Sequence, residues 1–194
     1  MSSTRPRLDH DQVLATAEAI VDRDGVQGLT MTALAKELGV KVPSLYNHVP
    51  NLEALRGELQ ARTLREIGER LNHKAMGRTG ETAMRALAAE FRRYAQAHPG
   101  RYDLAMQAPV DLPGFAAASV DAGAALHAVI RSYGIEDETL NLQLSTFAAL
   151  HGVLALENAG FFPSSIDTEP IFETVLGLVL DLLGGRAPGE ARAS

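Results

Sequence analysis

The segment that most constrains this chain is residues 30–49, which predicts two short helices joined by a tight turn. Leu34, Ala35 and Leu38 recur at helical spacing and form the apolar stripe of the first helix. Gly39 follows, and glycine suits the left-handed backbone conformation at which many helices end. This stretch therefore decides the class of function that the chain can have.

A second short helix is predicted directly after the turn. Pro43 fits the first turn of a helix, where a backbone N–H lacks a partner, and Pro50 ends the helix, which gives it the span 43–49. Leu45 and Val49 lie four residues apart and can pack on the first helix. These residues rise roughly 10 Å at 1.5 Å each, and the major groove is about 12 Å wide. The segment therefore predicts a helix-turn-helix with its second helix in DNA.

The same region resembles the DNA-binding region of the TetR (tetracycline-repressor-like) family of transcription regulators. The resemblance is carried by Leu29-Thr30-Met31, Leu34-Ala35, Leu38-Gly39-Val40, Leu45-Tyr46, His48 and Leu55, and it is closest in Val40-x-x-Pro43-x-Leu45-Tyr46-x-His48-Val49. Residues 150–162, which begin Leu150-His151-Gly152, resemble the signature of one class of TetR C-terminal domains.

One departure from the family is Leu52, which stands where the family commonly carries a lysine that holds a DNA phosphate. Three alternatives follow from it. Lys41 supplies that anchor, or an N-terminal arm with Arg5 and Arg7 supplies it, or DNA binding is weaker. The alternative for the arm itself is a disordered solubilising tail.

The chain as a whole predicts an all-α fold of about nine helices and no strand. Asp9 and Gln12 read as a capping box, Thr30 or Thr32 as the cap of the second helix, and Asn51 as the cap of the fourth. The expected helices end or break at glycine and proline, with a loop at 108–114. They are residues 9–23, 30–38, 43–49, 51–77, 81–97, 102–107, 115–132, 137–159 and 169–183.

With the resemblance, this predicts a three-helix DNA-binding head in residues 1–50, a regulatory and dimerisation body in 51–184, and a flexible tail in 185–194. In such a protein a twofold dimer presents two recognition helices to an inverted-repeat operator. The resemblance implies a repressor that a small-molecule effector releases from DNA. The alternative is a DNA-binding regulator without an effector, controlled by a partner protein or by its abundance.

Contacts with double-stranded DNA are expected from the helix-turn-helix. Lys41 and Tyr46 suit phosphates, Ser44 and Asn47 suit base edges, and His48 suits either. Packing is the alternative role for Tyr46, and a bond to its own helix end is the alternative for His48. The full set of candidates is Thr32, Lys41, Val42, Pro43, Ser44, Tyr46, Asn47 and His48.

Self-association is predicted because the last helix is apolar on more than one face, whereas a surface helix has a single apolar stripe. Gly177 within it costs about 1 kcal/mol relative to alanine, which is explained if another backbone approaches closely there. A fully buried helix inside a monomer is the alternative. The expected homodimer interface comprises Phe147, Leu150, Leu154, Val175, Gly177, Leu178 and Leu182.

A ligand pocket in the body is implied by the resemblance alone, and its ligand is unknown. Polar tips among apolar walls are what such a pocket requires, although core packing is the commoner role for each histidine, methionine or aromatic residue. The candidates are Tyr94, His98, Tyr102, Met106, Gln107, Phe115, His127, Arg131, Phe147 and His151.

Composition and the absence of certain motifs argue against other classes of function. The chain has no cysteine and six scattered histidines without metal-ligand spacing, so we expect no metal and no cofactor. No hydrolase elbow or phosphate-binding loop occurs, which argues against an enzyme. No apolar run resembles a membrane span or an export signal, so we expect a cytoplasmic protein. The net charge of −6 comes from the body, since residues 1–80 carry eleven basic and ten acidic residues and residues 81–194 carry seven and fourteen.

Overall fold

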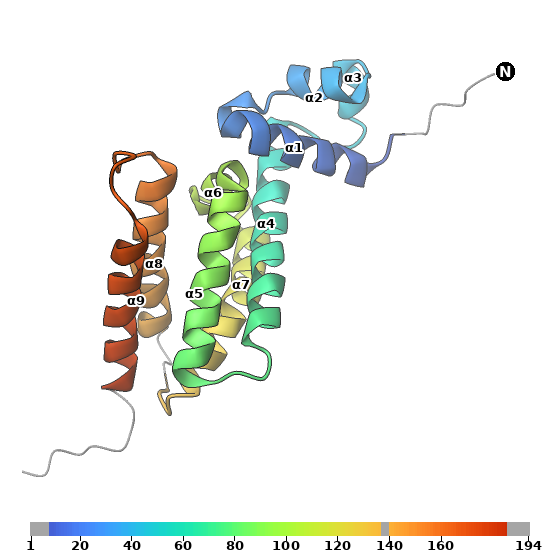
Figure 1. Ribbon diagram of the computed structural model, residues 1–194. Coiled ribbons are helices and arrows are strands. Elements are labelled where there is room, and N and C mark those ends of the chain that lie inside the picture. Colours follow the sequence, from blue (N-terminus) through green and yellow to red (C-terminus); the bar gives the residue numbers. More distant parts are fainter. Residues whose placement is uncertain (1–7, 137–139, 186–194) are drawn as a thin grey trace, which may run out of the picture. The chain divides into compact units, whose positions relative to one another are not determined.

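The computed structural model describes residues 8–136 and 140–185, and its regular secondary structure in those ranges is entirely α-helical (Figure 1). The all-α prediction is therefore confirmed for the described residues. Nine helices follow one another there: α1 (His10–Gly28), α2 (Met31–Leu38), α3 (Val42–Leu45), α4 (Leu52–Ala75), α5 (Gly80–Ala97), α6 (Pro99–Met106), α7 (Leu112–Arg131), α8 (Asn141–Asn158) and α9 (Glu169–Gly184). Arg5 and Arg7 of the predicted arm, and the predicted tail beyond Gly185, lie outside the described ranges.

The described chain packs as two compact units. The first comprises Met1–Leu64 and His98–Ala118, and the second comprises Arg65–Ala97 and Ser119–Ser194. The first unit thus holds α1, α2, α3 and α6 with parts of α4 and α7. The second holds α5, α8 and α9 with the remainder of α4 and α7. Packing therefore divides the chain differently from the predicted functional boundary at residue 50.

Local capping explains where the helices of the first unit begin. The Asp9 carboxylate accepts from the Gln12 backbone N–H at 2.7 Å, and the Gln12 side chain accepts from the Asp9 N–H at 3.1 Å, which is the predicted capping box. Thr30 caps α2 by accepting from the Ala33 N–H at 3.0 Å. Asn51 accepts from the Ala54 N–H at 2.7 Å at the start of α4. Each of these predicted caps is confirmed.

Two glycines shape the path of the chain in the same unit. Gly39 ends α2 with φ 65° and ψ 30°, the left-handed conformation that the turn requires. Gly25 has φ 72° and interrupts α1 where the sequence predicts its end. The residues from Val26 to Gly28 make one more turn before α2 begins.

The predicted extent of the second helix, 43–49, is wrong. Regular helix covers Val42–Leu45 only, and residues 46–48 form a turn in which the His48 N–H donates to the Leu45 carbonyl at 2.8 Å. The physical reason is Pro50, because its ring would clash with the Tyr46 carbonyl four residues earlier and it has no N–H to bond that carbonyl. The chain therefore leaves the helix within the four residues before it. We call residues 41–49 the recognition segment.

The first unit has its own apolar core. Leu45 and Val49 of the recognition segment are fully buried in it, together with Leu34 of α2 and Leu55 of α4. Leu104 of α6 joins the same core. These contacts fix α3, which is too short to hold its shape alone.

Helix α6 lies directly against α1. A Cβ atom at Gly100 would overlap the Val21 backbone carbonyl, so only glycine permits this approach. The sequence predicts α6 from residue 102, but it begins at Pro99, because proline at the first helical position has no N–H to satisfy. Pro113 similarly lies in the first turn of α7, and the predicted loop 108–114 therefore ends at residue 111.

In the second unit, α5 packs against both α8 and α9, which pack against each other. Arg92 of α5 binds both ends of the connection between α8 and α9. Its guanidinium donates to Glu157 at 2.8 Å, to Glu169 at 2.5 Å and to Thr168 at 3.2 Å, and it lies 4.6 Å from the centre of the Phe172 ring. Burial lowers the pKa of Arg92, but the two carboxylates outweigh it and hold that pKa above its ordinary value.

Helix α7 has an unusual surface. Among the described residues it alone is long and apolar enough to cross a bilayer by length and composition, and only 22% of its apolar stretch is buried inside the single chain. Asp121 lies near its middle, where a charge in a bilayer costs roughly 2.5–3.5 kcal/mol. Length and composition alone do not establish a membrane span.

Candidate nucleic-acid interface and effector site

The recognition segment presents its polar side chains on the surface of the first unit. Lys41, Pro43, Ser44, Tyr46 and Asn47 are exposed, whereas Leu45 and Val49 between and beyond them are buried. Tyr46 is 53% exposed, so packing in the core is not its role. The segment thus separates an anchoring face from a free face, as a reading helix must.

The remaining DNA candidates lie at the edges of this surface. Thr32 of α2 is exposed, and Val42 and His48 are half-buried. All eight candidates belong to the first unit, and their contact with DNA stays a prediction.

Leu52 does not offer a phosphate anchor. It begins α4, is half-buried and packs against the core of the first unit. Lys41 is exposed and no ion pair engages it among the described residues. Arg23 is engaged, because it pairs with Asp24 at 2.8 Å and with Glu37 at 2.7 Å. Of the three alternatives raised by Leu52, an anchor at Lys41 is thus available in the described chain.

The residue that sequence reasoning missed here is His10, in the first turn of α1. One ring nitrogen, Nδ1, lies 3.1 Å from the His48 carbonyl oxygen, and the other, Nε2, lies 2.6 Å from a Glu58 carboxylate oxygen. His10 therefore connects the recognition segment to α4. No local pattern reveals this, because the partners are 38 and 48 residues away.

The ten effector candidates divide between the two units. His98, Tyr102, Met106, Gln107 and Phe115 belong to the first unit, whereas Tyr94, His127, Arg131, Phe147 and His151 belong to the second. Each group is therefore described within its own unit.

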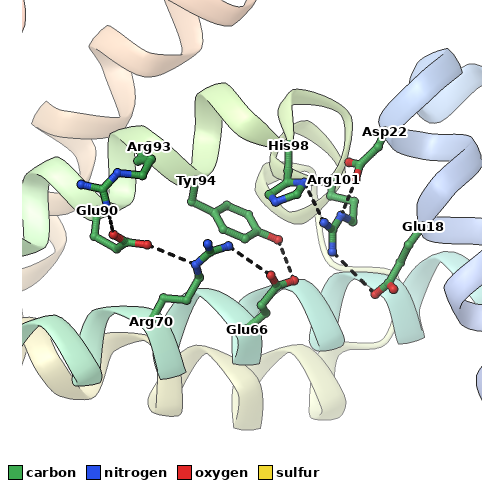
Figure 2. A network of polar contacts seen from close by, with 9 residues as sticks. All are labelled: Glu18, Asp22, Glu66, Arg70, Glu90, Arg93, Tyr94, His98 and Arg101. Carbon is green, nitrogen blue, oxygen red and sulfur yellow. Dashed lines mark hydrogen bonds and ion pairs between the residues drawn. The ribbon is translucent and has the colours of Figure 1, made fainter.

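Tyr94 belongs to a polar network of the second unit (Figure 2). Its hydroxyl donates to Glu66 at 3.1 Å, and Arg70 lies 5.3 Å from its ring centre. Arg70 also bonds Glu66 at 3.3 Å and the buried Glu90 at 3.1 Å, and Glu90 contacts Arg93 as well. The charges of this network compensate one another.

His98 belongs to a separate cluster in the first unit, also drawn in Figure 2. Its Nδ1 lies 3.1 Å from Asp22 and 2.7 Å from Arg101, and Arg101 donates to Asp22 at 2.9 Å. Tyr102 nearby on α6 is fully buried, and this burial raises the pKa of its phenol. The cluster joins α6 to α1.

An aromatic cluster in the second unit brings together two predicted ligand residues. The rings of Phe147 and His151 are stacked with centres 5.5 Å apart, and Phe91 of α5 lies 6.0 Å from Phe147. Burial lowers the pKa of His151, which favours the neutral imidazole. On α7 and α8, the buried His127 Nδ1 and Thr146 Oγ1 have no hydrogen-bond partner within the described part of the chain.

Two effector candidates do not belong to an interior wall. Gln107 is exposed and donates to Asp103 at 3.1 Å, and Arg131 is exposed and donates to Glu136 at 3.3 Å. Gln107 follows the end of α6 and Arg131 is the last residue of α7. We omit them from the proposed site.

The predicted dimer residues also divide. Leu150 and Leu154 are wrong as interface side chains, because Leu154 is 0% exposed and Leu150 is buried in the subunit's own core. Leu178 is 65% exposed and Leu182 is exposed too, whereas Phe147, Val175 and Gly177 are half-buried. An amphipathic pattern does not tell which apolar face of α8 points inward.

Comparison with known proteins finds relatives that are transcriptional regulators. Residues 84–179 match the family described as tetracyclin repressor-like, C-terminal domain. The uncharacterized HTH-type transcriptional regulator Rv0681 of Mycobacterium tuberculosis is 38% identical over 188 residues, which span 95% of this chain and 84% of that protein. Tetracycline repressor protein class D of Escherichia coli is 33% identical over 87 residues, which span 45% of this chain and 39% of that protein.

The fold is shared with solved structures. One is the crystal structure of the Streptomyces coelicolor TetR family protein ActR in complex with (S)-DNPA, with a TM-score of 0.64 and 21% sequence identity. The match covers 92% of this chain and 98% of that chain. At this identity the likeness concerns the fold alone.

Proposed function

The chain belongs to the TetR family of transcriptional regulators, and on that premise we propose that it is a repressor that binds an inverted-repeat operator as a homodimer and leaves it when a small-molecule effector binds. Its place of action is then the cytoplasm, where the DNA is. Residues 1–50 carry the reading function in this proposal, and residues 51–184 carry dimerisation and effector binding.

The observation that carries the proposal is the division of the recognition segment into two faces. Leu45 and Val49 anchor it in the core, and this leaves Lys41, Ser44 and Asn47 exposed beside Tyr46. Hydroxyl, amide and ammonium groups on one free surface can donate hydrogen bonds to phosphate oxygens. The hydroxyl and amide groups can also donate to base edges or accept from them.

Support for a homodimer comes from the outer faces of α8 and α9. Leu144 and Leu156 of α8 and Leu178 of α9 are exposed apolar side chains in the single chain. A Cβ at Gly152 of α8 or Gly177 of α9 would meet nothing of the same chain within 4 Å. Glycine at these helical positions is thus not required by the subunit's own packing, and a closely packed partner helix explains it.

Support for an effector comes from the second unit. The cluster of Phe91, Phe147 and His151 offers aromatic surface, and His127 and Thr146 hold buried polar atoms without hydrogen-bond partners in the described chain. A buried polar atom without a partner is costly unless a ligand or water satisfies it. The structural neighbour ActR has been crystallised in complex with (S)-DNPA. Tyr94, His98, Tyr102, Met106 and Phe115 stay in the proposal as candidates.

Two experiments test the proposal. Selection from a random duplex pool with the purified protein should return a consensus of two inverted half-sites, and an asymmetric consensus or none would contradict the proposal. A thermal-shift screen of metabolites and drugs should then find a stabilising compound that also releases the selected duplex. If no stabilising compound released it, the regulator without an effector, controlled by a partner protein or by abundance, would be the better account.

A further inference from the structure

His10 faces two hydrogen-bond acceptors at once. The His48 carbonyl can only accept, and so can the Glu58 carboxylate when ionised. Both distances, 3.1 Å from Nδ1 and 2.6 Å from Nε2, are within hydrogen-bond range. A neutral imidazole has only one N–H, so it satisfies only one of them.

Only two arrangements satisfy both contacts. In the first, His10 is an imidazolium and donates from both nitrogens, and Glu58 is ionised. In the second, His10 is neutral and donates from Nδ1, and a protonated Glu58 donates to Nε2. Both arrangements contain one proton more than a neutral imidazole beside a carboxylate. The pair therefore holds one additional proton whichever nitrogen or oxygen carries it.

The neighbouring charged groups on α1 and α4 have partners of their own. On α4, Glu58 faces His10. Arg62, one turn further along α4, pairs with Asp11 at 3.6 Å and with Glu18 at 2.9 Å. From α1, Asp9 is engaged in the capping box. From the recognition segment the pair is faced by the His48 backbone carbonyl.

The contact sits where it can act on DNA reading. The His48 carbonyl belongs to the turn that follows α3, two residues beyond Tyr46 and next to Asn47. α3 itself has only four residues, so its orientation depends on contacts at its ends. Through His10 that turn is bonded to α1 and, by Glu58, to α4.

We propose that the protonated His10–Glu58 pair positions the recognition segment and makes DNA binding depend on pH. This inference rests on the proposed function, since it concerns the same DNA-reading surface. The sign follows from the proton count: the pair is complete at low pH and is lost as pH rises and the additional proton leaves. Histidine is the side chain that commonly changes charge between about pH 5 and 8, so the experiment covers that range.

The expected size follows from exposure and symmetry. His10 and Glu58 side chains are 45% and 39% exposed, and such pairs change an equilibrium by a factor of about 1.5 to 5. A dimer that binds with two heads applies the factor twice, so operator affinity should change by about 2- to 25-fold across the titration.

The test compares full-length wild type with His10→Gln and Glu58→Gln, using the duplex returned by selection and fluorescence anisotropy from pH 5.5 to 8.5. The wild type should bind more weakly as pH rises. The control His73→Gln should show the same pH dependence as the wild type, since His73 is an exposed residue of α4 outside the network. Both pair variants should lose the same part of the pH dependence, and the double variant should lose no more. Pair variants with the wild-type pH profile would overturn the inference.

A readout without DNA separates this inference from the proposed function. Nitrogen-15 spectra of the His10 ring should show that Glu58→Gln shifts its protonation to lower pH, with His73 as the reference in the same spectra. An unchanged titration of the His10 ring in Glu58→Gln would overturn the inference even if the selected duplex binds well. If selection returned no duplex, the proposed function would fail, and the spectra would still decide whether the pair exists.

Discussion

At the scale of single residues, burial decides which charged contacts matter. Arg92 and Arg85 both lie on α5, and each bonds two glutamates of which at least one is on another helix. The Arg92 side chain is 9% exposed, whereas that of Arg85 is 46% exposed. Removing a buried cation leaves its carboxylates without compensation, while an exposed one is replaced by water.

Arg92→Met should therefore destabilise the protein by about 3–5 kcal/mol, because Glu157 stays buried without its partner. Arg85→Met is the matched control on the same helix and should change stability little. Chemical unfolding followed by circular dichroism gives both values. Equal losses of unfolding free energy in the two variants would show that burial does not make the Arg92 contacts more important than the exposed ones of Arg85.

His151 gives a pH dependence of the opposite sign to that of His10. Its pKa in the folded protein is lowered by burial, so the folded state resists protonation. Its contribution to stability is present above the ordinary histidine pKa of about 6.5 and is lost as pH falls below it. His151→Phe should thus remove part of the stability loss on the acid side in thermal melts from pH 7.5 to 5, whereas the exposed control His73→Gln should not. A wild-type slope in His151→Phe would contradict this.

At the scale of the elements, the recognition segment separates the roles of neighbouring side chains. Tyr46→Ala should weaken binding to every sequence, since a phenol suits a phosphate that all sequences share. Asn47→Ala should instead relax preference at one base position, with a cost of about 1–3 kcal/mol if its contact is bidentate. Repeating the selection and titration with each variant measures both. A uniform loss with Asn47→Ala would reassign that residue to the backbone.

Helix ends are the part of the fold that the sequence predicts best, because caps are local. Asp9, Thr30, Gly39 and Asn51 each act within four residues of their position in the chain. Contacts between distant segments are not predictable in this way. His10 and Glu58 are 48 residues apart, and no periodicity announces that they meet.

The same limit explains the errors in the candidate site. The pattern identified α8 as apolar, but only packing shows that Leu150 and Leu154 face inward. It likewise identified plausible ligand residues, whereas only packing shows that Phe147 stacks on His151 and that Gln107 lies on the surface. Residue type suggests a role, and the three-dimensional neighbours decide it.

At the scale of the whole molecule, DNA binding should depend on dimerisation. Leu178→Glu would place an unpaired carboxylate in the proposed interface, and a loss of roughly 3 kcal/mol there raises the dimer Kd about 100-fold. Operator affinity should fall with it, because one subunit holds one recognition segment. Light scattering and operator titration on the same variant measure both effects.

Met76→Glu is the matched control for this variant. Met76 is 67% exposed, a fraction similar to that of Leu178, but it follows the end of α4 and not α9. It should stay dimeric and bind operator normally. A Leu178→Glu protein that does the same at micromolar concentration would place the interface elsewhere.

The close approach of α6 to α1 has a consequence for protein engineering. The simplest design of a hybrid regulator joins the reading head of one protein to the sensing body of another at a single crossover. A crossover after residue 50 would leave the Val21 carbonyl against a foreign α6, and any residue larger than glycine at position 100 would collide with it. A working exchange should instead transplant Met1–Leu64 and His98–Ala118 together, as two segments of one block.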